Sequence, residues 1–527
     1  MRVDADVAIV GAGFAGSLMA MALRRRGRRV VLVERGHHPR FAIGESSTPL
    51  ANLLLEELAD AYDLPQIRVF SKWGTWQRSR PDVAGGLKRG FTFYFHQPGE
   101  PFVDDDRHGR QLMVAASPHD AIGDTHWFRP DFDLNLVREV QASGAIYLDD
   151  TAIDRVSFDE TGTTLTGSRD GDPVRVDASF VVDASGPRGF LARTLDLGAS
   201  ALRWLPPTQG LYTHFENVDQ WDSAHIGRPF QARQIPYPPD DAALHHIFPG
   251  GWIWVLRFNN GITSAGAAFL TRPEGGRHAS VGSGLSPASL WDDLLAMLPS
   301  VRAQFANARV AAPWVHAPQL AFRTARVVGS NWALLPSAAG VIDPLLSTGF
   351  PLTLLGIHRL LDVLDATSPG TERQAALGEY ERITLAELDA TELLVAALYA
   401  AMEDVPLFKR LTLLYFAAAS FSEAARRLGR PELAPGFLLH AHPAFGPQLK
   451  ACCEAAITSR GGDRDDLFER IDRAIAPFDI AGLLDRARRD WYPALAADLI
   501  ANASKLQATA EDIERLLERS GFSTTLR

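Results

Sequence analysis

Three glycines near the N-terminus have the spacing of a dinucleotide-binding loop. Gly11, Gly13 and Gly16 form the pattern G-x-G-x-x-G directly after the apolar run Val7–Val10. Glycines at this spacing allow a tight turn, close approach of the backbone to a pyrophosphate, and close packing of a helix on a strand. Glu34 lies about 20 residues further on, where a carboxylate can bind ribose hydroxyls. These residues predict that the chain binds an adenine dinucleotide.

The strands and the helix predicted around this loop would place it between a strand end and a helix start, as in dinucleotide-binding folds. Residues 7–10 and 30–33 have the continuous apolar character of buried parallel strands, and residues 17–26 have a helical composition. The predicted helix would direct free N–H groups and the positive end of its dipole toward the phosphates. The residues expected to hold the cofactor here are Gly11, Ala12, Gly13, Phe14, Ala15 and Gly16.

Length, composition and charge restrict the class of protein. A chain of 527 residues is too long for one core, and its 46% hydrophobic and 22% charged residues are ordinary for a globular protein. The net charge of −10 argues against a nucleic-acid partner, which would require a basic face. The only two cysteines, Cys452 and Cys453, are adjacent, so we expect no disulfide framework.

The same features predict the location of the protein. The scarcity of cysteine fits a reducing cytoplasm. We identify neither a signal peptide nor an apolar run of the roughly 18 to 20 residues that a membrane helix requires. We therefore predict a soluble, cytoplasmic protein with no membrane partner and no metal site.

The order of the predicted elements indicates an α/β fold in three parts. Residues 1–70, 125–198 and 325–365 are expected to form a discontinuous, Rossmann-like FAD-binding domain of the glutathione-reductase type. Residues 71–124 and 199–324, rich in β-branched and aromatic residues, predict an inserted antiparallel sheet that walls a substrate chamber. Residues 366–527 are expected to be mostly α-helical. This layout favours FAD over a nicotinamide, because FAD stretches across its domain and needs contacts from later segments.

Four stretches of the chain resemble the flavin-dependent halogenases, which belong to the aromatic-hydroxylase-like FAD superfamily. Among these halogenases, the chain resembles the phenol-type branch. The stretches are residues 38–49, 87–93, 244–254 and 342–349. The resemblance runs from the N-terminus to about residue 365, and more weakly over the helical tail. Members of this family halogenate aromatic compounds in the biosynthesis of secondary metabolites such as antibiotics.

The resemblance implies a reaction and its partners. FAD reduced by a separate NAD(P)H-dependent flavin reductase would react with oxygen and with chloride or bromide to yield hypohalous acid. The acid would pass through the protein to a lysine, which forms a haloamine or hydrogen-bonds the acid. Electrophilic halogenation of a small, electron-rich, phenolic aromatic would follow, with the substrate free or tethered to a carrier protein.

Lys88 matches the lysine of the family through the context K-x-G-x-x-F. A lysine ammonium carries three donors, and burial lowers its pKa toward the amine. The alternative is a solvated surface lysine, which is the usual fate of this residue type. Lys72 is a weaker candidate, because its sequence context lacks the motif.

Most of the remaining site residues follow from the resemblance, whereas Asp183 and Asp343 are predicted because each stands at the end of an apolar run. Thr348 and Gly349 would hold halide through backbone N–H groups, unless Ser347 or Thr348 is merely a helix cap. Trp252 and Trp254, with Phe93, would line the channel that keeps substrate from the flavin, unless they are core aromatics of a strand. The cofactor contacts expected outside the glycine loop are Glu34, Arg40, Ser46, Ser47, Thr48, Arg129, Asp183, Asp343 and Gly349. Four histidines could titrate near the chamber, but we assign a catalytic role to none of them: His96, His126, His245 and His246.

The sequence departs from the family pattern at three places. Leu256 and Arg257 stand where the tryptophan signature of the family continues with Ile and Pro. Either this change alters how the site keeps the substrate from being hydroxylated at the flavin, or Arg257 pairs with an acidic residue. Pro336-Ser337 replaces a Gly-Asp pair whose carboxylate binds the ribityl chain. Leu346 stands where tryptophan halogenases carry a glutamate, which argues against tryptophan as the substrate.

Two other functions remain open from the sequence. The first is an FAD-dependent aromatic monooxygenase, which the change at residues 256–257 favours. The second is a non-catalytic flavin-binding partner in a biosynthetic assembly, which the change at residues 336–337 favours. The sequence also leaves open a monomer or a homodimer.

Overall fold

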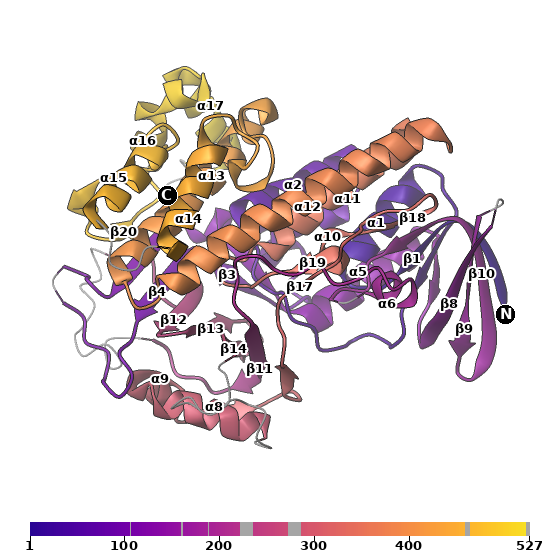
Figure 1. The fold of residues 1–527 in the computed structure, drawn as a ribbon, viewed down its shortest axis with the longest axis horizontal. Coiled ribbons are helices and arrows are strands. Elements are labelled where there is room, and N and C mark those ends of the chain that lie inside the picture. Colours follow the sequence, from indigo (N-terminus) through magenta and orange to yellow (C-terminus); the bar gives the residue numbers. More distant parts are fainter. Residues whose placement is uncertain are drawn as a thin grey trace.

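The computed structural model describes residues 1–105, 107–159, 162–187, 189–221, 235–271, 286–458 and 464–522. Figure 1 shows two β-sheets beside each other, with the helices that follow residue 349 covering one side of the molecule. The fold class predicted from the sequence is confirmed: a Rossmann-like α/β unit, a second sheet and a helical C-terminal region.

The first sheet carries the glycine loop. Its strand order is β7-β2-β1-β10-β9-β8, with β18 paired to β10. All four residues of β2 and the last four of β1 are buried, as expected for parallel strands covered on both faces. The strands are β1 (Arg2–Val10), β2 (Val30–Val33), β7 (Ile146–Leu148), β8 (Thr151–Asp159), β9 (Gly162–Arg169), β10 (Asp172–Asp183) and β18 (Trp332–Leu334). β1, β2, β7, β10 and β18 run parallel, and β8 and β9 form an antiparallel edge.

Helices from three parts of the chain flank this sheet. α1 (Phe14–Arg25) contacts α5 (Arg129–Ala142) and α11 (Gly349–Ala366). Ten consecutive residues of α1, from Phe14 to Leu23, are buried, because the helix lies between the sheet and its neighbours. Packing on several sides explains why its sequence is apolar rather than amphipathic.

The second sheet is mostly antiparallel, as predicted from residues 199–324. Its order is β15-β11-β14-β13-β12-β4-β5-β20, with β16 paired to β11. β12 runs parallel to β4, and β20 runs parallel to β5. The strands are β4 (Gly90–Phe95), β5 (Gln111–Ala115), β11 (Thr208–Glu216), β12 (Ala243–Phe248), β13 (Gly251–Arg257), β14 (Ile262–Leu270), β15 (Arg309–Val310), β16 (Val315–Ala317) and β20 (Trp491–Tyr492). The C-terminal region therefore contributes a strand as well as helices.

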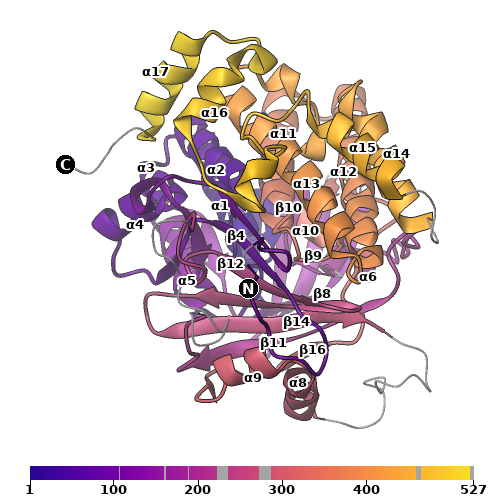
Figure 2. The same ribbon diagram turned by 90° about the vertical axis from the view of Figure 1, so that its left-hand side faces the viewer.

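Both faces of the second sheet are covered. In Figures 1 and 2, α8 (Pro287–Ala296) and α9 (Pro299–Gln304) lie on one face, and the C-terminal helices lie toward the other. Every residue of β4 and of β12 is buried. The aromatic run at 91–95 therefore packs against side chains above and below the sheet.

Two small sheets and the remaining helices complete the fold. β3 (Gly85–Lys88) pairs with β6 (Asp124–Trp127), and β17 (Phe322–Arg323) pairs with β19 (Gly340–Val341). The other helices are α2 (Pro49–Ala61), α3 (Pro65–Arg68), η1 (Val69–Ser71), α4 (Trp73–Ser79), η2 (Asp120–Ile122), α6 (Phe190–Thr194), α10 (Pro336–Ala339), α12 (Thr371–Ala400), α13 (Val405–Arg427), η3 (Pro431–Leu433), η4 (Phe437–Leu439), α14 (Phe445–Thr458), α15 (Arg464–Ile475), η5 (Arg486–Arg488), α16 (Ala496–Ala501), η6 (Ala503–Leu506) and α17 (Ala510–Ser520). Among the described helices, none is both long and apolar enough to cross a bilayer.

Candidate active site

The glycine loop joins β1 to α1 and has no room for a side chain at Gly11 or Gly16. Gly11 has a φ of +105°, and a Cβ there would lie 2.5 Å from the Ala184 carbonyl oxygen. A Cβ on Gly16 would lie 1.9 Å from the Gly11 carbonyl oxygen. Gly13 is the N-cap of α1 and supplies no side-chain cap, which leaves the first N–H groups of the helix open to a phosphate.

Charged side chains surround this loop in a way that fits a dinucleotide. One carboxylate oxygen of Glu34 accepts a hydrogen bond from the Ala12 N–H at 3.0 Å and lies 3.4 Å from the Arg40 guanidinium. Terminal nitrogens of Arg40 and Arg129 come within 3.6 and 3.3 Å of where a Cβ on Gly13 would stand. The Asp133 carboxylate pairs with Arg129 at 2.7 Å and Glu34 lies near Arg40, so the open N–H groups of the helix are the main anion-binding groups here. An uncapped helix N-terminus with two guanidinium groups beside it fits the pyrophosphate of FAD.

A cavity extends from the loop to the second sheet, and we call it the inner chamber. Gly44–Ser46 line it on one side, strand residues of β12 and β13 line another, and residues 336–353 close it. The structure brings the following sequence-predicted residues to its wall: Phe14, Ser46, Arg129, Trp252, Trp254, Asp343, Thr348 and Gly349. Residues separated by more than 300 positions in the chain therefore share one site.

The N-terminus of α11 faces the inner chamber. Thr348 occupies the N-cap position, but its side chain accepts no hydrogen bond from the helix backbone. A Cβ on Gly349 would meet no atom within 4 Å, so there is open space beside this N–H group. An 18-residue helix whose first N–H groups face a cavity is suited to hold an anion such as halide.

The two aspartates predicted for the cofactor have different environments. Asp343 lines the inner chamber, where its carboxylate accepts hydrogen bonds from the Tyr399 hydroxyl at 2.8 Å and the Leu345 N–H at 2.9 Å. Burial raises the pKa of Asp343 to about 7. Asp183 is fully buried, and its two oxygens accept hydrogen bonds from Ser185 and Leu191, so it shapes the turn after β10.

Lys88 is fully buried at the end of β3. Its ammonium donates hydrogen bonds to the Ser47 carbonyl at 2.6 Å and to the Ser46 hydroxyl at 2.9 Å. It also lies 3.7 Å from the centre of the Phe91 ring. Burial lowers the pKa of Lys88, although the nearby Asp124 carboxylate opposes this effect. The surface-lysine alternative is wrong.

Lys88 contacts a wall residue of the inner chamber and a wall residue of a second cavity, which we call the outer cavity. Ser46, one partner of Lys88, lines the inner chamber, whereas Phe91 and Asp124 line the outer cavity. The outer cavity is bounded by α2, β4, α13 and residues of the C-terminal region between 480 and 522. Its wall is mainly apolar, with Tyr415 and Phe416 among the rings that face it.

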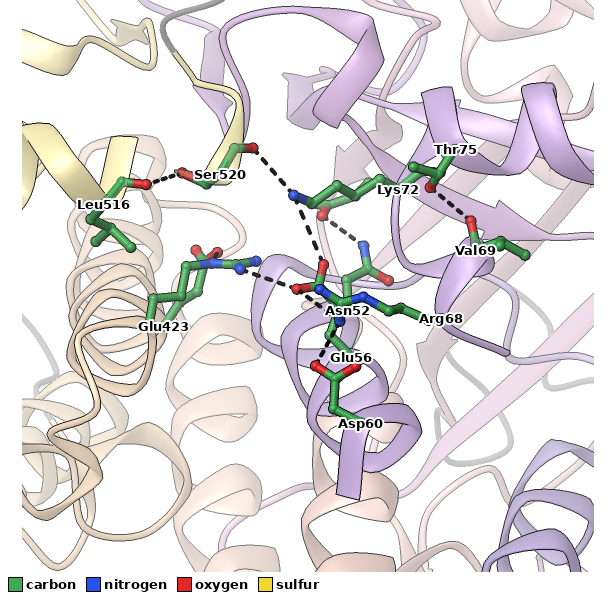
Figure 3. A network of polar contacts seen from close by, with 12 residues as sticks. Asn52, Glu56, Asp60, Arg68, Val69, Lys72, Thr75, Glu423, Leu516 and Ser520 are labelled. Atoms are coloured by element: carbon green, nitrogen blue, oxygen red, sulfur yellow. Dashed lines mark hydrogen bonds and ion pairs between the residues drawn. The ribbon is translucent and has the colours of Figure 1, made fainter. Parts of the chain in front are cut away.

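A polar network lies at one end of the outer cavity. Figure 3 shows Lys72, Asn52, Glu56 and Glu423 converging from α2, α13 and the segment between η1 and α4. Lys72 donates a hydrogen bond to the Ser520 carbonyl of α17 at 3.2 Å and lies 4.0 Å from the Glu56 carboxylate. Lys72 therefore connects the core to the C-terminal region and has no contact with the inner chamber.

Phe93, predicted for the channel, lines neither cavity and lies behind a residue of the chamber wall. Phe93 is fully buried and stacks on His245 with ring centres 4.5 Å apart, and His245 lines the inner chamber. Burial lowers the pKa of His245 and of His126 to about 3, which keeps both imidazoles neutral.

Among the described residues, no group of three or more potential ligands could hold a metal ion.

The Leu256-Arg257 departure has a structural explanation. Leu256 lines the inner chamber, whereas the Arg257 guanidinium pairs with Asp240 at 2.5 Å and donates to the carbonyl oxygens of Val218 and Asp219. The alternative in which Arg257 pairs with an acid is confirmed. Its charge is neutralised away from the chamber.

Sequence reasoning missed the partners of Lys88. Asp124 faces Lys88 in the β3–β6 register, and its carboxylate accepts a hydrogen bond from Asn52 at 2.7 Å. Burial raises the pKa of Asp124. Phe91 provides the ring beneath the ammonium. The aromatic run at 91–95 indicated the strand, but no local motif indicated the pairing of residues 88 and 124.

Comparisons with known proteins identify the family of this chain. Residues 6–331, more than half of the chain, match the family described as DAO, FAD dependent oxidoreductase. The tetracycline 7-halogenase of Kitasatospora aureofaciens is 31% identical over 394 residues, which cover 72% of this chain and 67% of that protein. The monodechloroaminopyrrolnitrin halogenase PrnC of Pseudomonas fluorescens is 30% identical over 404 residues, covering 76% of this chain and 69% of that protein.

Solved structures show the same fold. The crystal structure of halogenase PltM in complex with phloroglucinol and FAD has a TM-score of 0.81 and 26% identity, covering 92% of this chain and 99% of that chain. The flavin-dependent brominase Bmp2 has a TM-score of 0.58 at 17% identity, covering 92% of this chain and 97% of that chain. At this lower identity the second likeness concerns the fold alone.

Proposed function

This chain belongs to the FAD-dependent oxidoreductase family and is a flavin-dependent halogenase, and we propose that Lys88 directs its reaction on a phenolic ring. In this proposal FAD occupies the inner chamber and the aromatic substrate occupies the outer cavity. The observation that carries the proposal is the position of Lys88, buried between these two spaces and in contact with a wall residue of each.

The inner chamber supplies what the cofactor and halide require. When bound, reduced FAD supplies hypohalous acid from oxygen and chloride or bromide. The glycine loop, Arg40 and Arg129 would hold the pyrophosphate, and the N–H groups at Thr348 and Gly349 would bind halide. Trp252 and Trp254 line the same chamber and would exclude the ring of the substrate from it by bulk.

Lys88 can receive hypohalous acid and orient it toward the outer cavity. Its ammonium has three donors, and two of them are directed to Ser46 and Ser47. The third donor can bind the oxygen of the acid. The hydrogen bonds fix the side chain over Phe91, so the halogen is presented in one direction rather than released into water.

The outer cavity suits a small aromatic ring. Aromatic and aliphatic side chains dominate its wall, and polar groups are few, as is typical of sites that bind aromatic ligands. Relatives named above act on tetracycline and monodechloroaminopyrrolnitrin, and PltM binds phloroglucinol, which is a phenol. A phenol is activated by its own oxygen and therefore suits a site with a single directing lysine. We expect reduced FAD to come from a separate flavin reductase.

The experiment is a panel of phenols, indoles and pyrroles, free and carrier-tethered, with FAD, a flavin reductase, oxygen, and chloride or bromide. Mass spectrometry should detect halogenated phenols with the wild type. Lys88→Ala should abolish halogenation while FAD binding stays intact, and the matched variant of an exposed lysine, Lys450→Ala, should behave as the wild type. Full halogenation by Lys88→Ala, or a product that gains only oxygen, would overturn the proposal.

A further inference from the structure

Electrophilic substitution leaves a ring proton that some group must accept. The outer cavity has two carboxylates in its wall, Asp124 and Glu423. The Glu423 carboxylate accepts a hydrogen bond from the Arg427 guanidinium at 2.7 Å. The environment of Asp124 is different.

The two carboxylate oxygens of Asp124 differ in their hydrogen bonding. Its Oδ1 accepts a hydrogen bond from the Asn52 amide at 2.7 Å, which fixes the carboxylate plane. Its Oδ2 is buried and, within the described part of the chain, accepts no hydrogen bond. A buried carboxylate oxygen without a donor is costly, so it is retained where it has a use. Glu45 and Glu56 also have such an oxygen. Glu45 lines the inner chamber and pairs with His214, whereas Glu56 lines neither cavity and its oxygen lies 4.0 Å from the Lys72 ammonium.

Asp124 and Lys88 are direct neighbours across two antiparallel strands. The register places Lys88 of β3 opposite Asp124 of β6. Opposed residues of an antiparallel pair project from the same face, with Cβ atoms about 4.5–5.5 Å apart. The lysine and the carboxylate therefore act on the same side of the small sheet, where Asp124 borders the outer cavity.

We propose that Asp124 is a second catalytic residue, which accepts the ring proton through its Oδ2 after the halogen is transferred. This inference rests on the proposed function, because it requires the aromatic ring to react in the outer cavity beside Lys88.

The step is balanced as follows. An electron pair of the ring forms the carbon–halogen bond while the halogen–oxygen bond of hypohalous acid breaks, and the Lys88 ammonium gives a proton to the departing hydroxide to form water. The ring C–H bond then breaks, its electron pair restores aromaticity, and its proton goes to Asp124. Asp124 returns that proton to the Lys88 amine. The net reaction converts the arene and hypohalous acid into the haloarene and water.

The test uses Asp124→Asn, which preserves size and removes the base. General-base catalysis contributes about 10²–10⁴-fold to a proton transfer. Because this transfer is not rate-limiting in the wild type, we expect the overall rate of halogenation to fall by less, about tenfold or more. With a ring-deuterated phenol, the wild type should show little isotope effect and Asp124→Asn a clear one, because proton removal becomes rate-limiting. Oxidation of a small thioether to its sulfoxide in solution, which reports hypohalous acid formation, should be unchanged.

A second variant and a control variant test whether a loss of activity comes from misfolding instead of from the missing base. Asp124→Ala should regain halogenation when formate is added, because formate can enter the outer cavity and accept the proton. Asp82→Asn, a variant of an exposed aspartate before β3, should show the wild-type rate and isotope effect.

The outcomes separate this inference from the proposed function. Wild-type rate and isotope effect in Asp124→Asn, with Lys88→Ala inactive, would overturn the role of Asp124 and leave that of Lys88 standing. A loss of rate in Asp124→Asn with no isotope effect and no rescue of Asp124→Ala by formate would also overturn it. Full activity in both the Lys88 and the Asp124 variants would overturn both proposals.

Discussion

The inner chamber and the outer cavity meet at Lys88 but are built in different ways. The inner chamber is lined by short, motif-bearing segments such as Gly44–Ser46 and Pro344–Gly349, which connect strands and helices of the two sheets. The outer cavity is closed by α13 and by residues 480–522, which approach it from the far end of the chain. Turns and strand side chains line the first, whereas side chains of α2, α13 and the C-terminal region form much of the second.

This difference separates two tasks. The relatives named above are halogenases with different substrates, so the flavin and halide chemistry is the part they share, and turns with defined backbone geometry can hold such ligands. The substrate differs between relatives, and side chains on helices can be exchanged without disturbing the glycine loop. We therefore expect changes at the inner chamber to abolish or shift the common chemistry, and changes at the outer cavity to alter which ring reacts.

The largest expected effect is at the glycine loop. Gly16→Ala places a Cβ 1.9 Å from the Gly11 carbonyl oxygen, so β1 and α1 must move apart. We expect loss of FAD binding, measured by the visible absorbance of the purified protein, and loss of all halogenation. Gly36→Ala is the control, because a Cβ there meets no atom within 4 Å. Retention of FAD by Gly16→Ala would contradict the placement of the cofactor.

A pH-dependent effect should follow from Asp343 in the inner chamber. Burial raises its pKa from 3.8 to about 7 in the folded protein. Between these values the folded state holds a proton that the unfolded state has released, so the stability contributed by Asp343 falls as pH rises. A shift of this size corresponds to about 4 kcal/mol, which is lost between about pH 4 and pH 7.

The comparison of wild type with Asp343→Asn measures this contribution. The free energy of unfolding of the FAD-free protein, determined by urea titration, should show the wild type losing stability relative to the variant as pH rises toward 7. Above pH 7 the difference should stay constant. A difference that grows in favour of the wild type with rising pH would show that the carboxylate is stabilised as a charge.

The two regions also differ in how much the sequence revealed. The glycine loop, the buried strands and Lys88 were predicted because each depends on local spacing or on a short motif. The contact of Lys88 with Ser46 spans 42 positions, and the pairing with Asp124 depends on the register of β3 and β6. Such contacts are set by tertiary packing, which no local pattern encodes.

The outer cavity was the least predictable part of the site. The helical composition after residue 366 indicated burial, but it did not indicate what the helices would cover. Trp491–Tyr492 joins the second sheet as β20, parallel to β5, and this holds the segment that follows against the outer cavity. A two-residue strand has too few side chains to produce a periodic pattern in the sequence.

The smallest expected effect concerns the outer cavity and distinguishes binding from chemistry. Leu516 of α17 lines this cavity, and Leu516→Trp adds bulk there at a cost of about 1–3 kcal/mol. We expect kcat/KM to fall about tenfold for bulky phenols and less for small ones, with FAD binding unchanged, as measured by product formation over a series of substrate sizes. The control is Glu514→Trp, which adds the same ring to an exposed position of α17. An equal loss for every substrate size would place the effect of residue 516 on the chemistry instead of on substrate selection.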